Sequence, residues 1–218
     1  SAVGHAGRIL TVLFSSADGT RTQSVYGKTE TATGAGYQIH STTTDGFGNV
    51  THSWTKQTGL NASLLNYFGI VKFDSTTTES VTFGVDGSVT VTAPYVMSYT
   101  YDTTTPGHIG HITSASIDTI TSVTTDAFGN ITTSHSTQSN LDTALLAARG
   151  IVKFNKTTTD SVTNSVDGSQ TITDSYAMNY TYDSAAGHAG HILTVLFSSA
   201  DGTRTQSLYG KTETATGT

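Results

Sequence analysis

One stretch of the chain occurs twice, and this recurrence constrains the fold more than any local pattern. Residues 4–34 read GHAGRILTVLFSSADGTRTQSVYGKTETATG, and residues 187–217 read GHAGHILTVLFSSADGTRTQSLYGKTETATG. Over that span the copies differ only at Arg8/His191 and Val25/Leu208. Since similarity at a fixed spacing is the signature of repeat architectures, the recurrence predicts one full period of 183 residues and the opening of the next.

A second repeat lies inside this period. It divides the chain into a first half-unit over residues 1–102, a second over residues 103–183, and the start of the next period over residues 184–218. Ahead of its Phe-Gly-Asn turn the first half-unit carries roughly twenty extra residues, the length of another hairpin. The motifs at residues 45–49, 69–73, 85–88 and 99–102 return 81 positions later at residues 126–130, 150–154, 166–169 and 180–183.

The composition favours strands over helices. Charged residues make up 12% and hydrophobic residues 35% of the chain, and threonine is abundant. Threonine fits a pleated sheet surface, whereas a low hydrophobic content leaves little for one large core. We therefore predict an all-β fold of antiparallel hairpins in tandem repeats, stacked into an elongated body with a thin core. A parallel β-solenoid is the alternative, although solenoid coils usually repeat every ~20–30 residues.

Charge and cysteine content argue against several classes of partner and chemistry. The formal net charge is −6 and only 10 residues are Lys or Arg, which argues against nucleic acid because phosphate binding needs clustered cations. Cysteine is absent, so disulfides, thiol catalysis and cysteine-ligated zinc are excluded. No apolar run is long enough to span a bilayer, and we expect no membrane insertion by this segment.

Apolar and alternating runs predict the positions of strands and turns. Residues 9–15, ILTVLFS, are apolar on both faces and predict a strand buried on two sides. A turn at residues 17–20 and a returning strand over residues 21–31 are expected to follow it. Asp-Gly pairs at residues 86–87 and 167–168 are strong hairpin signals. Further strands are expected at residues 37–44, 50–54, 70–73, 120–125, 131–134 and 151–154, the first two flanking the turn at residues 45–49.

Each half-unit also carries one helix signal. Residues 61–69 and 142–150 each offer a capping residue, a pair of leucines and a terminating glycine. A helix of about two turns is marginal alone, so we expect each to cover one side of the sheet with its leucines. These leucines are Leu64, Leu65, Leu145 and Leu146.

Aromatic residues alternate along one segment of each half-unit. The period of two places them on one face of a strand, where stacked copies would form an aromatic stripe. The residues on this face are Tyr95, Met97, Tyr99 and Tyr101, and in the second half-unit Tyr176, Met178, Tyr180 and Tyr182.

The Tyr-x-Tyr-Asp motif carries a family resemblance. Tyr-Thr-Tyr-Asp at residues 99–102 is followed by Gly107 and Gly110, and the same motif at residues 180–183 by Gly187 and Gly190. Together with the two Phe-Gly-Asn turns, this resembles the YD, or Rhs-type, repeats of large bacterial surface and toxin-delivery proteins. The resemblance implies β-hairpins that wind into a continuous sheet within an exported giant protein.

Paired histidines are the candidates for a metal site. Gly-His-x-Gly-His places His108 three residues before His111, and His188 three residues before His191. Imidazole nitrogen binds zinc, copper or nickel. In the near-identical first copy Arg8 takes the place of the second histidine, which argues against an obligatory ligand. We favour solvated histidines in a glycine-rich turn and expect no metal.

The sequence also argues against a calcium site and against a catalytic site. Aspartates recur in glycine-containing turns, but no segment has the alternating carboxylates of a calcium loop, so turn chemistry is favoured and calcium is the alternative. No Gly-x-Ser-x-Gly elbow and no phosphate-binding loop occur. We therefore expect no cofactor and no enzymatic activity.

These observations favour a structural role. Near-identical units suit a scaffold, whereas a catalytic site needs one differentiated copy. We expect a structural repeat segment of a long extracellular bacterial fibre, stalk or surface filament. The alternative is an adhesin-type binding module for glycan or host surface, with the extra hairpin before Asp45 as its binding face.

The partner we expect is the protein itself. Residues 192–198 should lie against the half-unit that ends at Asp183, as residues 9–15 lie against a preceding unit. Such an apolar strand would leave an unpaired edge. We therefore predict strand pairing across each boundary, within one giant chain or head-to-tail between chains. The predicted assembly residues are Leu13, Phe14, Leu196 and Phe197.

Overall fold

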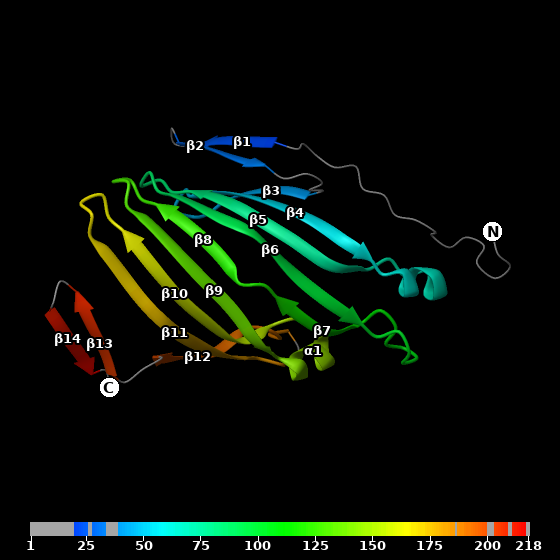
Figure 1. Ribbon diagram of the computed structural model, residues 1–218. Coiled ribbons are helices and arrows are strands. Elements are labelled where there is room, and N and C mark those ends of the chain that lie inside the picture. The colour runs from blue at the N-terminus through cyan, green and yellow to red at the C-terminus, as the bar shows by residue number, and fades with distance from the viewer. Residues whose placement is uncertain are drawn as a thin grey trace.

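The computed structural model describes the backbone of residues 20–25, 28–33, 39–185, 187–199, 203–208 and 211–216, with the side chains of residues 39–185 and 187–198. In this part of the chain most residues belong to one ten-stranded, antiparallel, open sheet with two short helices (Figure 1). The predicted mostly-β, antiparallel class is confirmed. The strand predicted over residues 9–15, with Leu13 and Phe14, and most of the turn at residues 17–20 lie outside the described residues.

The main sheet follows the chain almost in order from one edge to the other. Its strands are β3 (Ile39–Thr44), β4 (Val50–Leu60), β5 (Phe73–Phe83), β6 (Val89–Tyr101), β8 (Ile120–Thr125), β9 (Ile131–Leu141), β10 (Phe154–Asn164), β11 (Gln170–Tyr182) and β12 (Ile192–Ser199). β7 (Ile112–Ile117) pairs with the second part of β6, whose first part pairs with β8. Thus β7 and β8 follow one another along a single edge of β6.

The bounds of β3, β4, β5 and β6 return 81 positions later as those of β8, β9, β10 and β11. β7 and β12 also correspond, since Met97 pairs with Ile117 as Met178 pairs with Phe197. The 81-residue spacing therefore reappears in the bounds of β3 to β6 and β8 to β11, whereas Ile117 of β7 and its counterpart Phe197 of β12 are 80 residues apart.

The extra segment of the first half-unit forms a separate hairpin. β1 (Thr20–Val25) pairs antiparallel with β2 (Lys28–Thr33), and β13 (Thr203–Leu208) pairs with β14 (Lys211–Thr216) in the same way. β1 and β2 thus form a hairpin within the segment where the length of the first half-unit predicts an extra one. The prediction of a single strand over residues 21–31 was wrong, because Val25 pairs with Lys28 and the segment doubles back on itself.

Aspartates form the predicted turns with their own neighbours. The carboxylate of Asp45 accepts the backbone N–H of Phe47 and of Asn49, each at 2.9 Å. Asp126 accepts the equivalent groups of its own turn at 2.8 and 2.9 Å. At the Asp-Gly hairpins Gly87 has φ 83° and Gly168 φ 84°, the left-handed region that glycine adopts without strain. These hairpins are confirmed.

Both predicted helices form, as η1 (Leu64–Phe68) and α1 (Thr143–Arg149). The side chain of Asp142 caps α1 by accepting the N–H of Leu145 at 2.8 Å, and that of Asn61 accepts the N–H of Leu64, the first residue of η1, at 2.9 Å. Leu64, Leu65, Leu145 and Leu146 are all buried as expected, between 0% and 4% exposed. The strands expected from residues 70 and 151 begin only at Phe73 and Phe154, since the chain first leaves each helix through a left-handed glycine.

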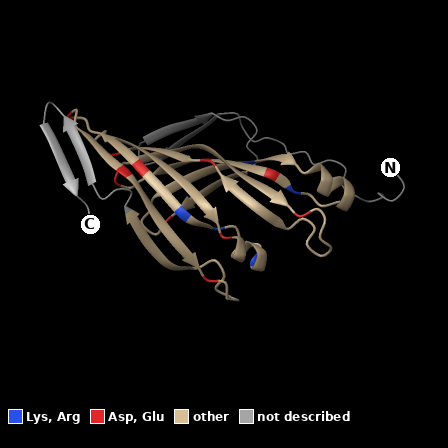
Figure 2. Ribbon diagram, turned by 60° about the horizontal axis from the view of Figure 1, so that its bottom comes forward, with Lys and Arg blue, Asp and Glu red and all other residues tan. Residues whose placement is uncertain are grey.

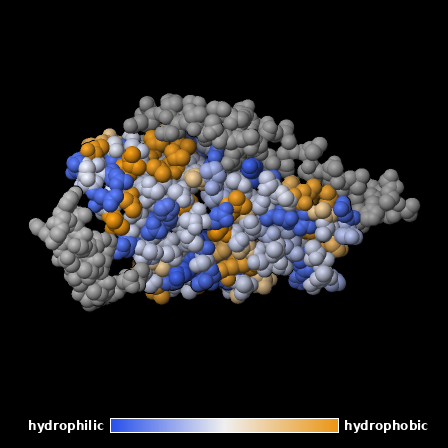
Figure 3. Space-filling view, in the orientation of Figure 1, coloured by the Kyte–Doolittle hydropathy of each residue, from blue (hydrophilic) through white to orange (hydrophobic). Residues whose placement is uncertain are grey.

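The largest buried cluster belongs to the first half-unit. Trp54, Val81, Phe83 and Val89 pack together, with Phe83 completely buried. In the second half-unit the counterparts of Trp54, Phe83 and Val89 are His135, Asn164 and Gln170, all polar. Few charged residues lie along the strands (Figure 2), and the visible surface alternates small apolar and polar patches (Figure 3). The core is therefore thin, as the composition predicts.

Candidate assembly edge and histidine loops

β12 forms one edge of the sheet and is the candidate assembly site. It pairs with β11 on one side, with Val195 opposite Tyr180 and Phe197 opposite Met178. Residues 192–198 therefore lie beside the half-unit that ends at Asp183; that residues 9–15 take the equivalent place stays a prediction, because they lie outside the described residues. The side chains of Ile192, Leu193, Val195, Leu196 and Phe197 are between 41% and 74% exposed. The expectation of burial on two faces, drawn from the matching copy at residues 9–15, does not hold for β12.

The counterpart strand β7 is covered by neighbouring elements that β12 lacks within the described residues. β7 lies against β9 and α1, which belong to the second half-unit. Ala115 of β7, opposite Tyr99, is 8% exposed, whereas its counterpart Val195, opposite the equivalent Tyr180, is 41% exposed. Within the described residues, no half-unit follows β12 in the sheet. The exposure of β12 thus arises from its position at the end of the sheet.

Two stretches of backbone edge are open in the same way. Residues 89–92 of β6 pair with β8, but residues 170–173 of β11, their counterparts, have no strand on that side within the described part of the chain. At the opposite edge β3 pairs with β4 and with no other described strand, and all six of its residues are exposed. Unpaired N–H and C=O groups at a sheet edge are a template for another strand.

The predicted assembly residues lie on different faces. Phe197 is the counterpart of Ile117 and shares a face with Val195, whereas Leu196 is the counterpart of Ser116, which is exposed in β7. If a second copy covers β12 as β9 and α1 cover β7, then Phe197 is covered and Leu196 stays exposed. Leu13 and Phe14 lie outside the described residues.

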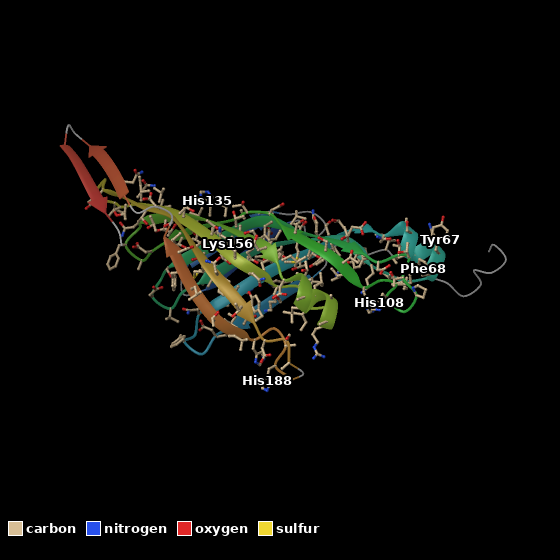
Figure 4. The ribbon with its side chains drawn as sticks, turned by 90° about the horizontal axis from the view of Figure 1, so that it is seen from below. Tyr67, Phe68, His108, His135, Lys156 and His188 are labelled. Atoms are coloured by element: carbon tan, nitrogen blue, oxygen red, sulfur yellow. The ribbon has the colours of Figure 1, made fainter. Side chains whose placement is uncertain are left out.

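The histidine pairs lie in two loops at the end of the sheet that carries the helices. The rings of His108 and His111 are 5.2 Å apart in an edge-to-face arrangement, and those of His188 and His191 are 5.5 Å apart. All four are exposed. His108 and His188 are well separated (Figure 4), so the two pairs do not combine into one site.

The geometry of each histidine loop is that of a closed turn. In the first loop the N–H of Asp102 donates to the carbonyl of His111, and Gly110 donates back to the carbonyl of Asp102. Gly110 has φ 81° and packs so closely on Ile70 that an added Cβ would lie 3.4 Å away. No group of three or more His, Cys, Asp or Glu side chains able to hold a metal occurs among the described residues. Within the part of the chain that the structure describes, each pair thus brings two imidazoles together without a third His, Cys, Asp or Glu side chain.

Asp102 of the Tyr-x-Tyr-Asp motif holds the first of these loops. Its carboxylate accepts the N–H of Thr105 and of Thr104, each at 2.8 Å. These bonds lower the pKa of Asp102 to about 2. Asp183 accepts the N–H of Ala185 at 2.7 Å in the second loop. The aspartate of this motif therefore acts as a turn residue.

We expect the stability of the protein to depend on the charge of Asp102. Because its pKa is lower in the folded chain than in the unfolded one, it stabilises the fold above about pH 4 and loses this effect as pH falls toward 2. Asp102→Asn keeps an acceptor but cannot titrate. Urea unfolding midpoints measured from pH 5 to pH 2 should fall more steeply for the wild type than for this variant. Parallel curves would show that Asp102 contributes nothing to the acid sensitivity.

A shallow pocket of about 500 Å³ lies beside this loop. Tyr101 donates its hydroxyl to the carbonyl of Phe73 at 2.7 Å, and the Lys72 ammonium lies 5.8 Å from the centre of the Tyr101 ring. Tyr182, Phe154 and Lys153 repeat the arrangement at 2.9 and 5.6 Å. All the lining residues recur unchanged 81 positions later: Gln57, Val71, Lys72, Phe73, Thr76, Tyr99 and Tyr101 become Gln138, Val152, Lys153, Phe154, Thr157, Tyr180 and Tyr182.

The tyrosines confirm the predicted alternation only within each strand. The rings of Tyr99 and Tyr101 lie 6.4 Å apart, and those of Tyr180 and Tyr182 lie 6.2 Å apart. A stripe that continues through further copies stays a prediction.

A ring stack in the first half-unit was not foreseen from the sequence. His40 stacks on Trp54 at 5.1 Å and on His52 at 5.4 Å, and Thr42 Oγ1 lies 3.0 Å from His52 Nδ1. Burial, with the neighbouring His40, lowers the pKa of His52. The signal was the two-residue spacing of His52 and Trp54 on one strand, opposite His40 across the Asp45 turn.

Comparison with models of known protein families, with curated proteins and with solved structures finds no match. Among the described residues no helix has the length and apolar character needed to cross a membrane.

Proposed function

We propose that this chain is a structural repeat segment of a long extracellular bacterial fibre, stalk or surface filament, without catalysis. Its role is to extend a β-sheet by adding further half-units. The observation that carries the proposal is the contrast between β7, covered by β9 and α1, and β12, its uncovered counterpart. The resemblance of the Tyr-x-Tyr-Asp and Phe-Gly-Asn motifs to YD repeats supports the same role and the placement at the cell surface.

The proposal depends on the two edges being different from one another. One edge presents β12 and the first residues of β11, and the other presents β3. Unlike edges that fit each other give head-to-tail growth, which continues into filaments when it does not close into a ring. The same contacts would join successive periods in one longer chain.

Assembly in solution tests the proposal. We expect the purified chain to form linear oligomers whose mean mass rises with protein concentration, measured by size-exclusion chromatography with light scattering and seen as filaments by electron microscopy. The cause is the burial of β12 and the pairing of both edges. A monomer at every concentration up to the solubility limit would contradict head-to-tail assembly.

A glycan-binding adhesin is the second candidate function, favoured by the pocket beside Lys72, whose lining residues recur around Lys153. Tyrosine rings offer apolar faces to sugar rings, while Gln57, Thr76 and Lys72 offer polar groups beside them. We expect the chain to bind sugars on a glycan array, and the double change Tyr99→Ala and Tyr180→Ala to abolish this binding without loss of the folded state. That result would support this function. Binding that survives both changes would locate the site elsewhere.

A further inference from the structure

Within the described residues, the two open edges of the sheet retain the Thr–Thr and Thr–Ser pairs that join β6 to β8. We propose that β3 of a second copy of this chain pairs with residues 170–173 of β11, in the register in which β8 pairs with β6. This inference rests on the proposed function and names the strands and the register that perform it.

The template is the join between the two half-units. In it Val89 pairs with Thr125, Thr90 with Thr124, Val91 with Val123 and Thr92 with Ser122. Because the strand bounds of the half-units differ by 81, the counterparts of the β6 residues are residues 170–173, and those of the β8 residues are residues 41–44. The resulting partners are Gln170 with Thr44, Thr171 with Thr43, Ile172 with Thr42 and Thr173 with Ser41 of the second copy.

Side-chain hydroxyls make this register specific. In the template the hydroxyls of Thr90 and Thr124 lie 2.8 Å apart, and those of Thr92 and Ser122 lie 3.1 Å apart. The matching pairs across the two open edges are again Thr with Thr, at 171 and 43, and Thr with Ser, at 173 and 41. Their identity is retained even though Val91 and Val123 become Ile172 and Thr42. A slip by one residue would place all these hydroxyls on the wrong face.

The apolar face of β12 fits the same arrangement. β7 is covered by β9 and α1, whose counterparts are β4 and η1. A second copy paired through its β3 therefore brings its β4 and η1 over β12. η1 carries two exposed aromatic residues, Tyr67 at 70% and Phe68 at 40% (Figure 4), and β12 offers Phe197 at 74%. One docking event thus completes the backbone edge and covers the apolar strand.

The test uses cysteine pairs, which the chain permits because it contains none of its own. Thr171→Cys is mixed with Thr43→Cys under mild oxidation, and a parallel sample mixes Thr171→Cys with Ser41→Cys. Directly opposed residues in an antiparallel pair have Cα atoms about 4.5–5.5 Å apart, within disulfide range, whereas residues two positions off are about 7 Å or more apart. We expect disulfide-linked heterodimers to form at least about 10-fold faster in the first mixture, and this preference to disappear in denaturant.

A chain carrying both Thr171→Cys and Thr43→Cys extends the test. We expect a ladder of linked oligomers on a non-reducing gel, because each chain then has one reactive site at each end. A single fast-migrating band would mean that the two edges meet within one chain and would overturn the proposal.

The possible failures can be told apart. Linear oligomers that link equally fast or faster through Ser41→Cys would overturn this register while leaving the scaffold function intact. Absence of oligomers together with absence of linking would contradict both.

Discussion

Phe83→Ala is expected to lower the free energy of unfolding by about 3–5 kcal/mol, the usual cost of truncating a fully buried phenylalanine. Phe83 is 0% exposed and packs with Trp54, Val81 and Val89 in the largest buried cluster of the described sheet. Its ring also meets the edge of His52 at 6.2 Å. Removing it leaves a cavity beneath the only tryptophan, which makes tryptophan fluorescence during urea unfolding a suitable measurement.

The second half-unit supplies the matched control. Asn164 is the counterpart of Phe83 and is exposed, with its side-chain oxygen accepting one bond from Gln170 at 2.9 Å. Asn164→Ala should therefore change the free energy of unfolding by no more than about 0.5 kcal/mol. If Phe83→Ala and Asn164→Ala lower the free energy of unfolding equally, the apolar cluster around Trp54 contributes no more stability than the polar residues at the equivalent positions of the second half-unit.

Phe197→Asp is expected to weaken self-association about 10- to 100-fold while leaving the monomer folded. Covering a phenylalanine side chain contributes about 1.5–3 kcal/mol, and 1.4 kcal/mol corresponds to one factor of ten in affinity. Phe197 is 74% exposed in the isolated chain, so its replacement removes little from the fold itself. The measurement is the concentration dependence of the mean mass by light scattering, with circular dichroism as the check on folding.

Leu196→Asp is the matched control for this prediction. Leu196 is 66% exposed and adjoins Phe197, but it is the counterpart of Ser116 on the uncovered face of β7. The same charge placed one residue away should leave association nearly unchanged. If Leu196→Asp disrupts assembly as strongly as Phe197→Asp, the internal join is not the template for the contact between copies.

Turns and caps could be read from the sequence because their hydrogen bonds join near neighbours. Asp45 bonds to residues two and four positions ahead, and Asp142 caps a helix through a residue three positions ahead. The Asp-Gly hairpins and the left-handed glycines Gly69 and Gly150 are local in the same sense. Such features need no knowledge of which strands become neighbours.

The order of strands needed the tertiary structure, because similar segments acquire different surroundings. β7 and β12 hold corresponding positions in register, yet one is covered by β9 and α1 and the other is exposed. The stack of His40, His52 and Trp54 likewise forms only when the Asp45 hairpin brings β3 and β4 together. Cross-strand contacts of this kind depend on pairing, which a residue pattern alone leaves open.

The sequence by itself determined the repeat spacing, the mostly-β class, the main hairpin turns and the two capped helices, since each follows from periodicity or from hydrogen bonds within a few residues. Only the tertiary structure decided that Phe197 faces the side covered in β7, that Leu196 does not, and that residues 170–173 and β3 are open edges within the described part of the chain. The physical reason is that burial and edge pairing are properties of neighbours in space, and the near-identical segments of this chain do not share the same neighbours.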